Sequence, residues 1–122
     1  MDLNQLRIGR NTLHHVLVAK SSWQRLRGWY GYQHLPVQGV LLTQCDAVHT
    51  FAMPLRLDLL WLDHDWQCIG VQRSLRAWRI AWCRGASHVL ELREGGLDAA
   101  DSLHELVGNR LTWHRLDEVK PF

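Results

Sequence analysis

The sequence predicts a mainly β protein with a minor α component, a compact barrel-like domain of about seven or eight short strands with two short helices. Short runs of β-branched, leucine and aromatic residues recur along the chain, with turn-forming residues between them. Most gaps between these runs are too short for the crossover helices that parallel strands need. A length of 122 residues fits one domain, so residues 1–122 are expected to fold as a unit.

The first half of the chain contains four strand-like runs and one expected helix. The run T-L-H-H-V-L-V-A at residues 12–19 is rich in residue types that favour strands. Ser21 and Ser22 can cap a short helix over residues 23–27, which Gly28 ends. Pro54 separates the last two runs. The expected strands span residues 12–19, 40–43, 48–53 and 55–62.

A hairpin and a half-buried strand begin the second half. The D-H-D sequence of residues 63–65 predicts a turn, and residues 66–75 then return as the partner of the preceding strand. In residues 78–82, two tryptophans and an isoleucine alternate with an arginine and an alanine, which is the period of a half-buried strand. We expect the tryptophan–isoleucine face to pack in the core.

The last third of the chain predicts a helix between two strands. Asp98 and Asp101 lie near the expected helix start, where the helix dipole favours negative charge, and Gly108 stands at its end. The expected elements are a strand over residues 88–93, a helix over residues 98–107 and a strand over residues 110–116.

Composition excludes several classes of protein. The formal net charge of +2 is too small to argue for nucleic acid by itself. Three cysteines without a close pair argue against a disulfide framework and a zinc finger. The N-terminal residues contain no apolar run typical of a signal peptide, and no stretch approaches the roughly 20 apolar residues of a membrane span. We therefore expect a cytoplasmic protein with free thiols, no cofactor and no membrane partner.

Cys45, His49 and Met53 are spaced four residues apart and are the side chains that a soft metal such as copper prefers. On a helix they would be neighbours. On a strand, at about 3.3 Å per residue, successive members would lie roughly 13 Å apart, too far for one ion. The composition of the stretch, and Met53 directly before Pro54, favour the extended form. We therefore expect no metal bound by these three residues together; a metal held by one of them with residues distant in sequence stays open.

Polar side chains in apolar surroundings are the candidates for a binding site. His49 would lie in a mostly apolar row of its strand, as a hydrogen-bonded core histidine or as part of a site. Asp58 and Glu91 each interrupt an apolar run, as salt-bridged structural acids or as groups with a raised pKa. An arginine of the first helix is a natural partner for such carboxylates. The candidate ligand-binding residues are Arg25, His49, Thr50, Asp58 and Glu91.

Six motifs occur in a fixed order: W-Q-R-L-R-G at 23–28, G-V-L-L at 39–42, C-D-A-V-H-T-F-A-M at 45–53, L-D-L-L-W-L-D at 57–63, A-S-H-V-L-E-L at 86–92 and G-N-R-L at 108–111. Together they resemble the DUF192 family over roughly residues 12–116. The resemblance implies a small, β-rich, barrel-like domain of bacteria and archaea, and it supplies no reaction. Its pattern positions would be Arg25, Gly28, His49, Thr50, Met53, Asp58 and Glu91.

Three functions are open. The leading hypothesis is a non-enzymatic module that binds a small ligand or a protein around His49, Thr50 and Asp58, because the chain has no nucleophile elbow, P-loop or dinucleotide fingerprint. The second is an enzyme with His49 as general base and Asp58 orienting it. The third is single-stranded nucleic-acid binding through the arginines and tryptophans of residues 73–84. We do not expect nucleic acid, because the tryptophan pattern there is typical of a core.

Overall fold

The computed structural model describes residues 2–21, 29, 37–95 and 103–115 of the chain. Strands dominate this part, and its one helix is a short 3-10 helix. None of its helices is long and apolar enough to cross a bilayer. The elements are β1 (Asp2–Ile8), β2 (Asn11–Ala19), β3 (Gly39–Leu42), β4 (Ala47–His49), β5 (Leu57–Leu62), β6 (Cys68–Leu75), β7 (Ile80–Trp82), β8 (His88–Arg93), η1 (Leu103–Leu106) and β9 (Leu111–Arg115).

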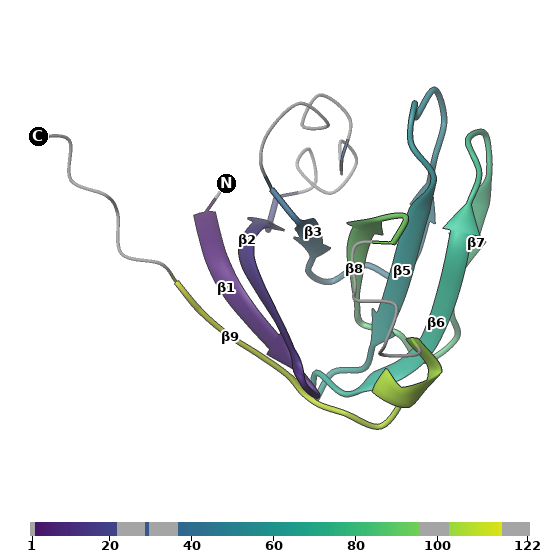
Figure 1. The fold of residues 1–122 in the computed structure, drawn as a ribbon. Helices are drawn as coiled ribbons and strands as arrows, with labels where there is room; N and C mark the ends of the chain where they lie inside the picture. The colour runs from purple at the N-terminus through teal and green to yellow at the C-terminus, as the bar shows by residue number, and fades with distance from the viewer. Residues whose placement is uncertain (1, 22–28, 30–36, 96–102, 116–122) are drawn as a thin grey trace, which may run out of the picture.

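Seven of the strands form one curled sheet in the order β6-β5-β8-β3-β2-β1-β9. Neighbouring strands are antiparallel except β2 and β3, which run parallel. The sheet bends into a trough, with β1, β2 and β9 on one side and β5, β6 and β8 on the other (Figure 1). The remaining strands, β4 and β7, pair with each other as a separate two-stranded ribbon.

The prediction of a barrel is wrong, because the described part of the sheet does not close. Its edge strands, β6 and β9, approach each other only where both begin. There the N–H of Leu111 donates to the carbonyl of Trp66 at 2.7 Å, and the N–H of Cys68 donates to the carbonyl of Asn109 at 2.8 Å. Beyond these bonds the two strands diverge (Figure 1). The architecture is an open, curled sheet with two edges.

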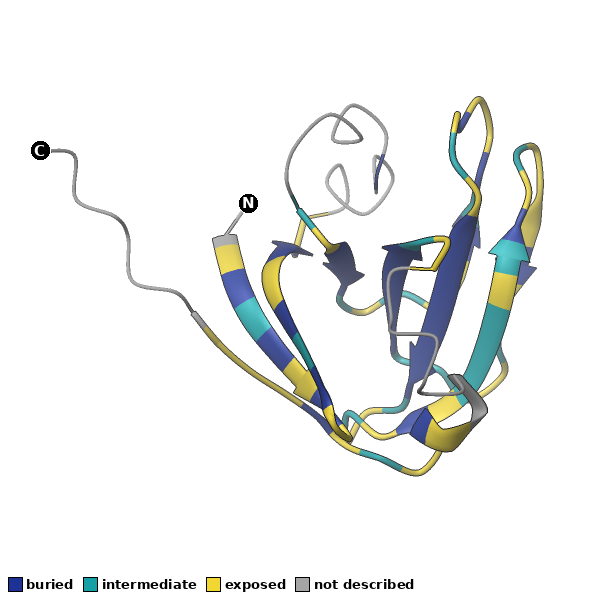
Figure 2. Cartoon of the chain, in the orientation of Figure 1, coloured by how far each residue is buried: buried dark blue, intermediate teal, exposed yellow. Residues whose placement is uncertain are grey.

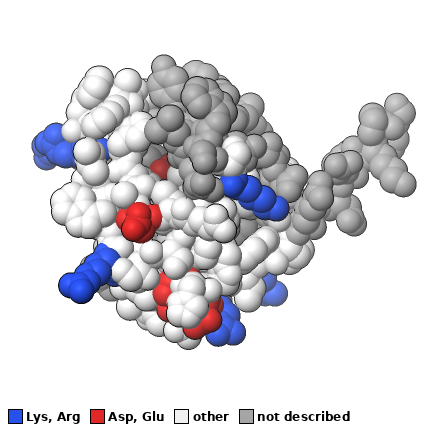
Figure 3. All heavy atoms as spheres, turned by 180° about the vertical axis from the view of Figure 1, so that it is seen from behind, with Lys and Arg blue, Asp and Glu red and all other residues white. Residues whose placement is uncertain are grey.

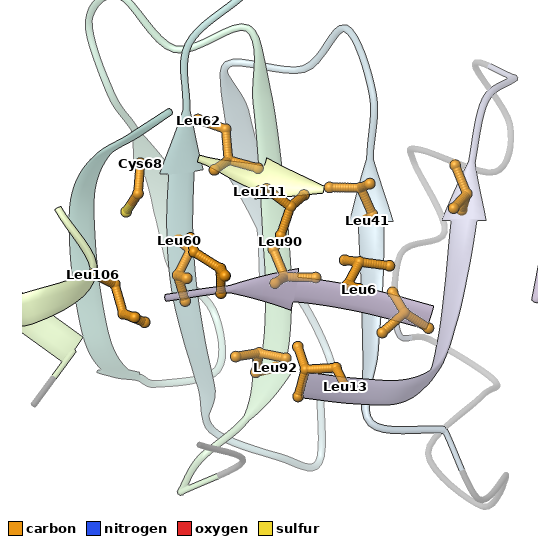
Figure 4. Packing of buried hydrophobic residues seen from close by; sticks show 13 residues of the cluster. Leu6, Leu13, Leu41, Leu60, Leu62, Cys68, Leu90, Leu92, Leu106 and Leu111 are labelled. Atoms are coloured by element: carbon orange, nitrogen blue, oxygen red, sulfur yellow. The ribbon is translucent and has the colours of Figure 1, made fainter. Parts of the chain in front are cut away.

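The curl buries both faces of the central strands and creates two hydrophobic cores. β3, β5 and β8 are buried along nearly their whole length, which explains why their sequences are continuous apolar runs (Figure 2). The first core fills the trough between the pair of β1 and β2 on one side and the pair of β5 and β8 on the other (Figure 4). The second core lies on the opposite face of the sheet, where the ribbon contributes Val48 and Ala81 beside Trp29.

Most expected strands are confirmed, and the exceptions have physical reasons. β2, β3, β5, β6, β8 and β9 match the predicted runs within a few residues. β1 was not expected, although buried Leu6 and Ile8 alternate with Gln5 and Arg7. The strand expected over residues 48–53 ends early, because the chain turns after Thr50.

That turn also separates residues expected to share one face. Ala52 adopts a left-handed backbone conformation with φ of 57°. As a result Met53 enters the second core, whereas Phe51 stays at the surface. His49 therefore lies beside Phe51 and not beside a row that includes Met53.

The two expected helices are not confirmed. The helix over residues 23–27 lies outside the described residues. Of the helix over residues 98–107, the described part contains only the 3-10 helix Leu103–Leu106. Gly108 follows it with φ of 92°, a left-handed conformation that ends the turn as a glycine readily does.

Candidate interaction surface

The described part of the chain does not gather the predicted ligand-binding residues in one place. Arg25 lies outside it. In the register of β5 and β8, Asp58 is opposite Leu92 and Glu91 is opposite Leu59. Adjacent residues of a strand point to opposite faces, so Asp58 faces the trough and Glu91 faces the other side of the sheet. A ligand-binding role for these residues stays a prediction.

Asp58 anchors an irregularity between β5 and β6. The pairing of these strands shifts between Leu57 and Leu59, and Ser74 on β6 has a left-handed φ of 54°. The carboxylate Oδ1 accepts the N–H of Ser74 at 2.9 Å, and Oδ2 accepts the N–H of Gly95 at 3.0 Å. A β-bulge removes backbone groups from the ladder, and Asp58 supplies an acceptor for the N–H of Ser74 there and a second one for the N–H of Gly95, which follows β8. This role explains its burial without a ligand.

Glu91 is buried next to Trp29. The indole Nε1 of Trp29 donates to the backbone carbonyl of Glu91 at 3.1 Å, and the guanidinium of Arg93 lies 5.1 Å from the centre of the same indole. Burial raises the pKa of the Glu91 carboxyl to about 8, against a smaller opposing effect of a hydrogen bond from the Trp29 backbone. The carboxyl is therefore mostly protonated at neutral pH.

Thr50 joins the end of β4 to the turn that precedes β7. Its backbone N–H donates to the carbonyl of Arg79 at 2.9 Å, and its carbonyl accepts the N–H of Trp78 at 2.9 Å. Its hydroxyl donates to the carbonyl of Arg76 at 2.5 Å and accepts the N–H of Arg79 at 3.0 Å. Thr50 is fully buried. These bonds fix the backbone position of Trp78, which has a left-handed φ of 62°.

His49 ends β4 and is partly exposed. Its Nδ1 accepts the N–H of Phe51 at 3.3 Å, and the two ring centres are 4.9 Å apart. With Nδ1 as acceptor, the neutral imidazole carries its proton on Nε2, which is then a donor. Asp58 is not among the partners of His49 in the described part of the chain. The His–Asp pair that the enzyme hypothesis needs is not formed there.

The surface around His49 exposes four large apolar side chains. Phe51 is 44% exposed, Trp78 65%, Ile80 60% and Trp82 72%. Phe51 and Trp78 stack with ring centres 5.8 Å apart, and Ile80 lies opposite His49 in the β4–β7 register. We call the surface formed by His49, Phe51, Trp78, Ile80 and Trp82 the aromatic face.

The prediction that the tryptophan–isoleucine face packs in the core is wrong. The strand expected over residues 78–82 is confirmed only as β7, Ile80–Trp82, in which the residue that points to the sheet is Ala81, 5% exposed and part of the second core. Trp78 and Arg79 precede the strand, and both are exposed. Strand alternation shows which residues share a face and not which face is buried. The available signal was the arginines placed between the tryptophans, since core strands rarely carry them.

The aromatic face lies in a basic stretch of the sequence. Between Asp65 and Glu91 the chain has four arginines and neither aspartate nor glutamate. All four are exposed. On the face seen from behind, the cationic side chains stand apart, with uncharged surface and a few acidic side chains between them (Figure 3). The four arginines are Arg73, Arg76, Arg79 and Arg84.

The fold and this surface define a small β-sheet protein that presents an aromatic face on an accessory ribbon. The chain belongs to the DUF192 family, described as "Uncharacterized ACR", whose family model matches residues 5–113. The resemblance seen in the ordered motifs is thereby confirmed. The chain matches no curated protein sequence.

Two solved structures share the fold. One is a protein of unknown function from Novosphingobium aromaticivorans, with a TM-score of 0.72, 15% identity and coverage of 91% of this chain and 84% of the other. The second, from Sinorhizobium meliloti, is described as a "putative transcription regulator", with a TM-score of 0.69, 24% identity and coverage of 92% of each chain. At these identities the likeness concerns the fold alone.

Proposed function

We propose that this protein is a non-enzymatic module that binds a partner protein through the aromatic face. The observation that carries this proposal is the exposure of Trp78, Ile80 and Trp82, each at 60% or more, on β7 and the turn that precedes it. A protein that exposes large apolar side chains so near one another gains free energy when a partner covers them. Tryptophan is also among the residues that contribute most to binding at protein interfaces.

The polar residues of the motif segment support this surface. Thr50 fixes the turn that contains Trp78, and the His49 ring lies tilted against that of Phe51. The carboxylate of Asp58 accepts hydrogen bonds from two backbone N–H groups. His49 and Thr50, which the family resemblance implies are pattern positions, therefore lie in the aromatic face and directly beside it, which supports a link between the family motif and the proposed function.

Peptide selection tests the proposal. The immobilised protein is used to select binders from a display library of random peptides, and the binders are then measured against the variant Ile80→Ser/Trp82→Ser. We expect affinity for the variant to fall by about tenfold or more, because two central apolar contacts are lost. The matched control is Val107→Ser, which replaces an exposed apolar residue elsewhere. If no peptide is enriched, or if all three proteins bind alike, the proposal fails.

Single-stranded nucleic acid is the second candidate. It is favoured by four arginines interleaved with exposed tryptophans, since basic groups and stacking rings together bind unpaired bases. The regulator description of the Sinorhizobium meliloti protein agrees with this reading but belongs to that protein. Anisotropy of a labelled single-stranded oligonucleotide decides it: nucleic-acid binding requires affinity that falls steeply as salt rises. No binding at low salt excludes this candidate.

A further inference from the structure

We propose that the partner is an acidic, extended segment that adds to the ribbon as a third strand along β7. This inference rests on the proposed function and specifies its geometry. An extended peptide can bind a sheet edge through backbone hydrogen bonds while its alternate side chains contact the strand beside it. Three features of β7 fit that mode: its open edge, its side-chain pattern and its charge.

The open edge follows from the hydrogen bonds between β4 and β7. The N–H of Thr50 donates to the carbonyl of Arg79, and the N–H of Cys83 donates to the carbonyl of Asp46. These two opposing pairs are four residues apart, so the hydrogen-bonded pair between them is Val48 and Ala81. The backbone groups of the intervening residues of β7 must then point away from β4.

Those intervening residues are Ile80 and Trp82. In the described part of the chain their N–H and C=O groups have no backbone partner. The two residues are two positions apart, and in a β-strand every second residue directs its backbone groups to the same side. One more strand could therefore form hydrogen bonds with the N–H and C=O groups of both residues. On the other edge of the ribbon, the carbonyl of Ala47 already accepts the Cys45 thiol at 2.9 Å.

The side chains of the same residues continue the argument. Ile80 and Trp82 stand on the outer surface of the ribbon, next to the open edge, and exposed Trp78 lies in the turn just before them. A strand added along β7 would place its own alternate side chains beside them, as cross-strand neighbours about 5 Å away. Apolar residues at every second position of the partner would then cover the aromatic face.

Charge selects between possible occupants. Arg79 and Arg84, which flank β7, oppose edge-to-edge pairing of two copies of this chain, because pairing would bring like charges together. The nearest acid of the ribbon, Asp46, precedes β4 on the other strand. Acidic residues between the apolar positions of the partner would complement the arginines. A segment that alternates apolar and acidic residues meets both requirements.

Amide hydrogen exchange with a peptide of alternating valine and glutamate tests this inference. In the free protein, the amides of Ile80 and Trp82 should exchange quickly and that of Ala81 slowly. Saturating peptide should slow exchange at Ile80 and Trp82 by about tenfold or more, with Ala81 as the internal control. A peptide of alternating valine and lysine is the charge control and should not bind.

Peptides N-methylated at every second residue, in each of the two phases, separate the possible outcomes. One phase should abolish binding and the other should not, because only one edge of the added strand faces β7. Binding that is lost in Ile80→Ser/Trp82→Ser but survives both methylated phases overturns strand addition and leaves the proposed function standing. Absence of binding by the valine–glutamate peptide, stronger binding of the lysine peptide, displacement by an oligonucleotide, or self-association of the protein also overturns the inference.

Discussion

At the scale of single residues, two buried polar side chains of the described part, Asp58 and Thr50, bind the protein's own backbone. Asp58 accepts two N–H groups and Thr50 makes bonds on both sides of the turn before β7. A buried polar group without such partners would cost free energy, which is why each of these side chains stands where the strand pairing is interrupted. Their sequence context, a polar residue within an apolar run, predicted a special role but not its kind.

Replacement of Asp58 tests its backbone role. In Asp58→Asn one carboxylate oxygen becomes an amide nitrogen, so either Ser74 or Gly95 loses its acceptor. We expect the free energy of unfolding to fall by about 1–3 kcal/mol. Urea denaturation measures it, with the exposed Asp46→Asn as control, for which we expect a change within about 0.5 kcal/mol. Equal stability of both variants would contradict the role.

The raised pKa of Glu91 should make the free energy of unfolding depend on pH. Because the folded-state pKa lies near 8 instead of the ordinary 4.5, the folded protein retains a proton that the unfolded chain releases. This contribution to stability is complete below pH 4.5 and is lost as pH rises to about 8. The largest slope is about 1.4 kcal/mol per pH unit. Glu91→Gln should remove this slope, as urea midpoints across that window will show; parallel curves for parent and variant would count against it.

At the scale of elements, the ribbon depends on the hydroxyl of Thr50. Thr50→Val preserves the shape of the side chain but leaves the N–H of Arg79 without its acceptor, so we expect a loss of about 1–3 kcal/mol. Thr50→Ser retains the hydroxyl and should cost less. Denaturation of both variants measures the difference, and faster amide exchange at Arg79 in the valine variant alone locates it. If the two variants were equally stable, the hydroxyl would have no such role.

Local sequence predicted the central strands better than the ribbon. Runs such as L-D-L-L-W-L are apolar because β5 is buried on both faces, and composition alone reveals that. The order of strands, the open edges and the parallel pair of β2 and β3 depend on contacts between distant residues. For β7, the sequence shows which residues share a face but not which face is buried. The small Ala81, and not the large residues, packs inward.

The candidate site was less predictable than the fold. The sequence indicates His49, which lies in the aromatic face, but it predicts a core position for Trp78, Ile80 and Trp82, which are exposed. Asp58 and Glu91 are close in the sheet but face opposite sides of it, which follows from a register that a single sequence does not reveal. The residue pattern of an individual strand therefore indicates which segment carries the candidate site, but not which of its residues form that site.

At the scale of the whole molecule, the two hydrophobic cores hold the sheet and the ribbon in place, and the ribbon carries the aromatic face. The trough core holds the curled sheet together, and the second core fixes the ribbon through Val48 and Ala81. Since the ribbon needs only its inner side for this attachment, its outer side can carry apolar residues that folding does not use. Stability and binding should therefore be separable by mutation.

The variant Ile80→Ser/Trp82→Ser measures that separation most directly, with unfolding and peptide binding followed on the same sample. We predict a free energy of unfolding within about 1 kcal/mol of the parent, because exposed side chains contribute little to folding, together with peptide affinity reduced by about tenfold or more. A variant that unfolds several kcal/mol more easily, or that binds selected peptides as the parent does, would contradict the assignment of the aromatic face as the binding surface.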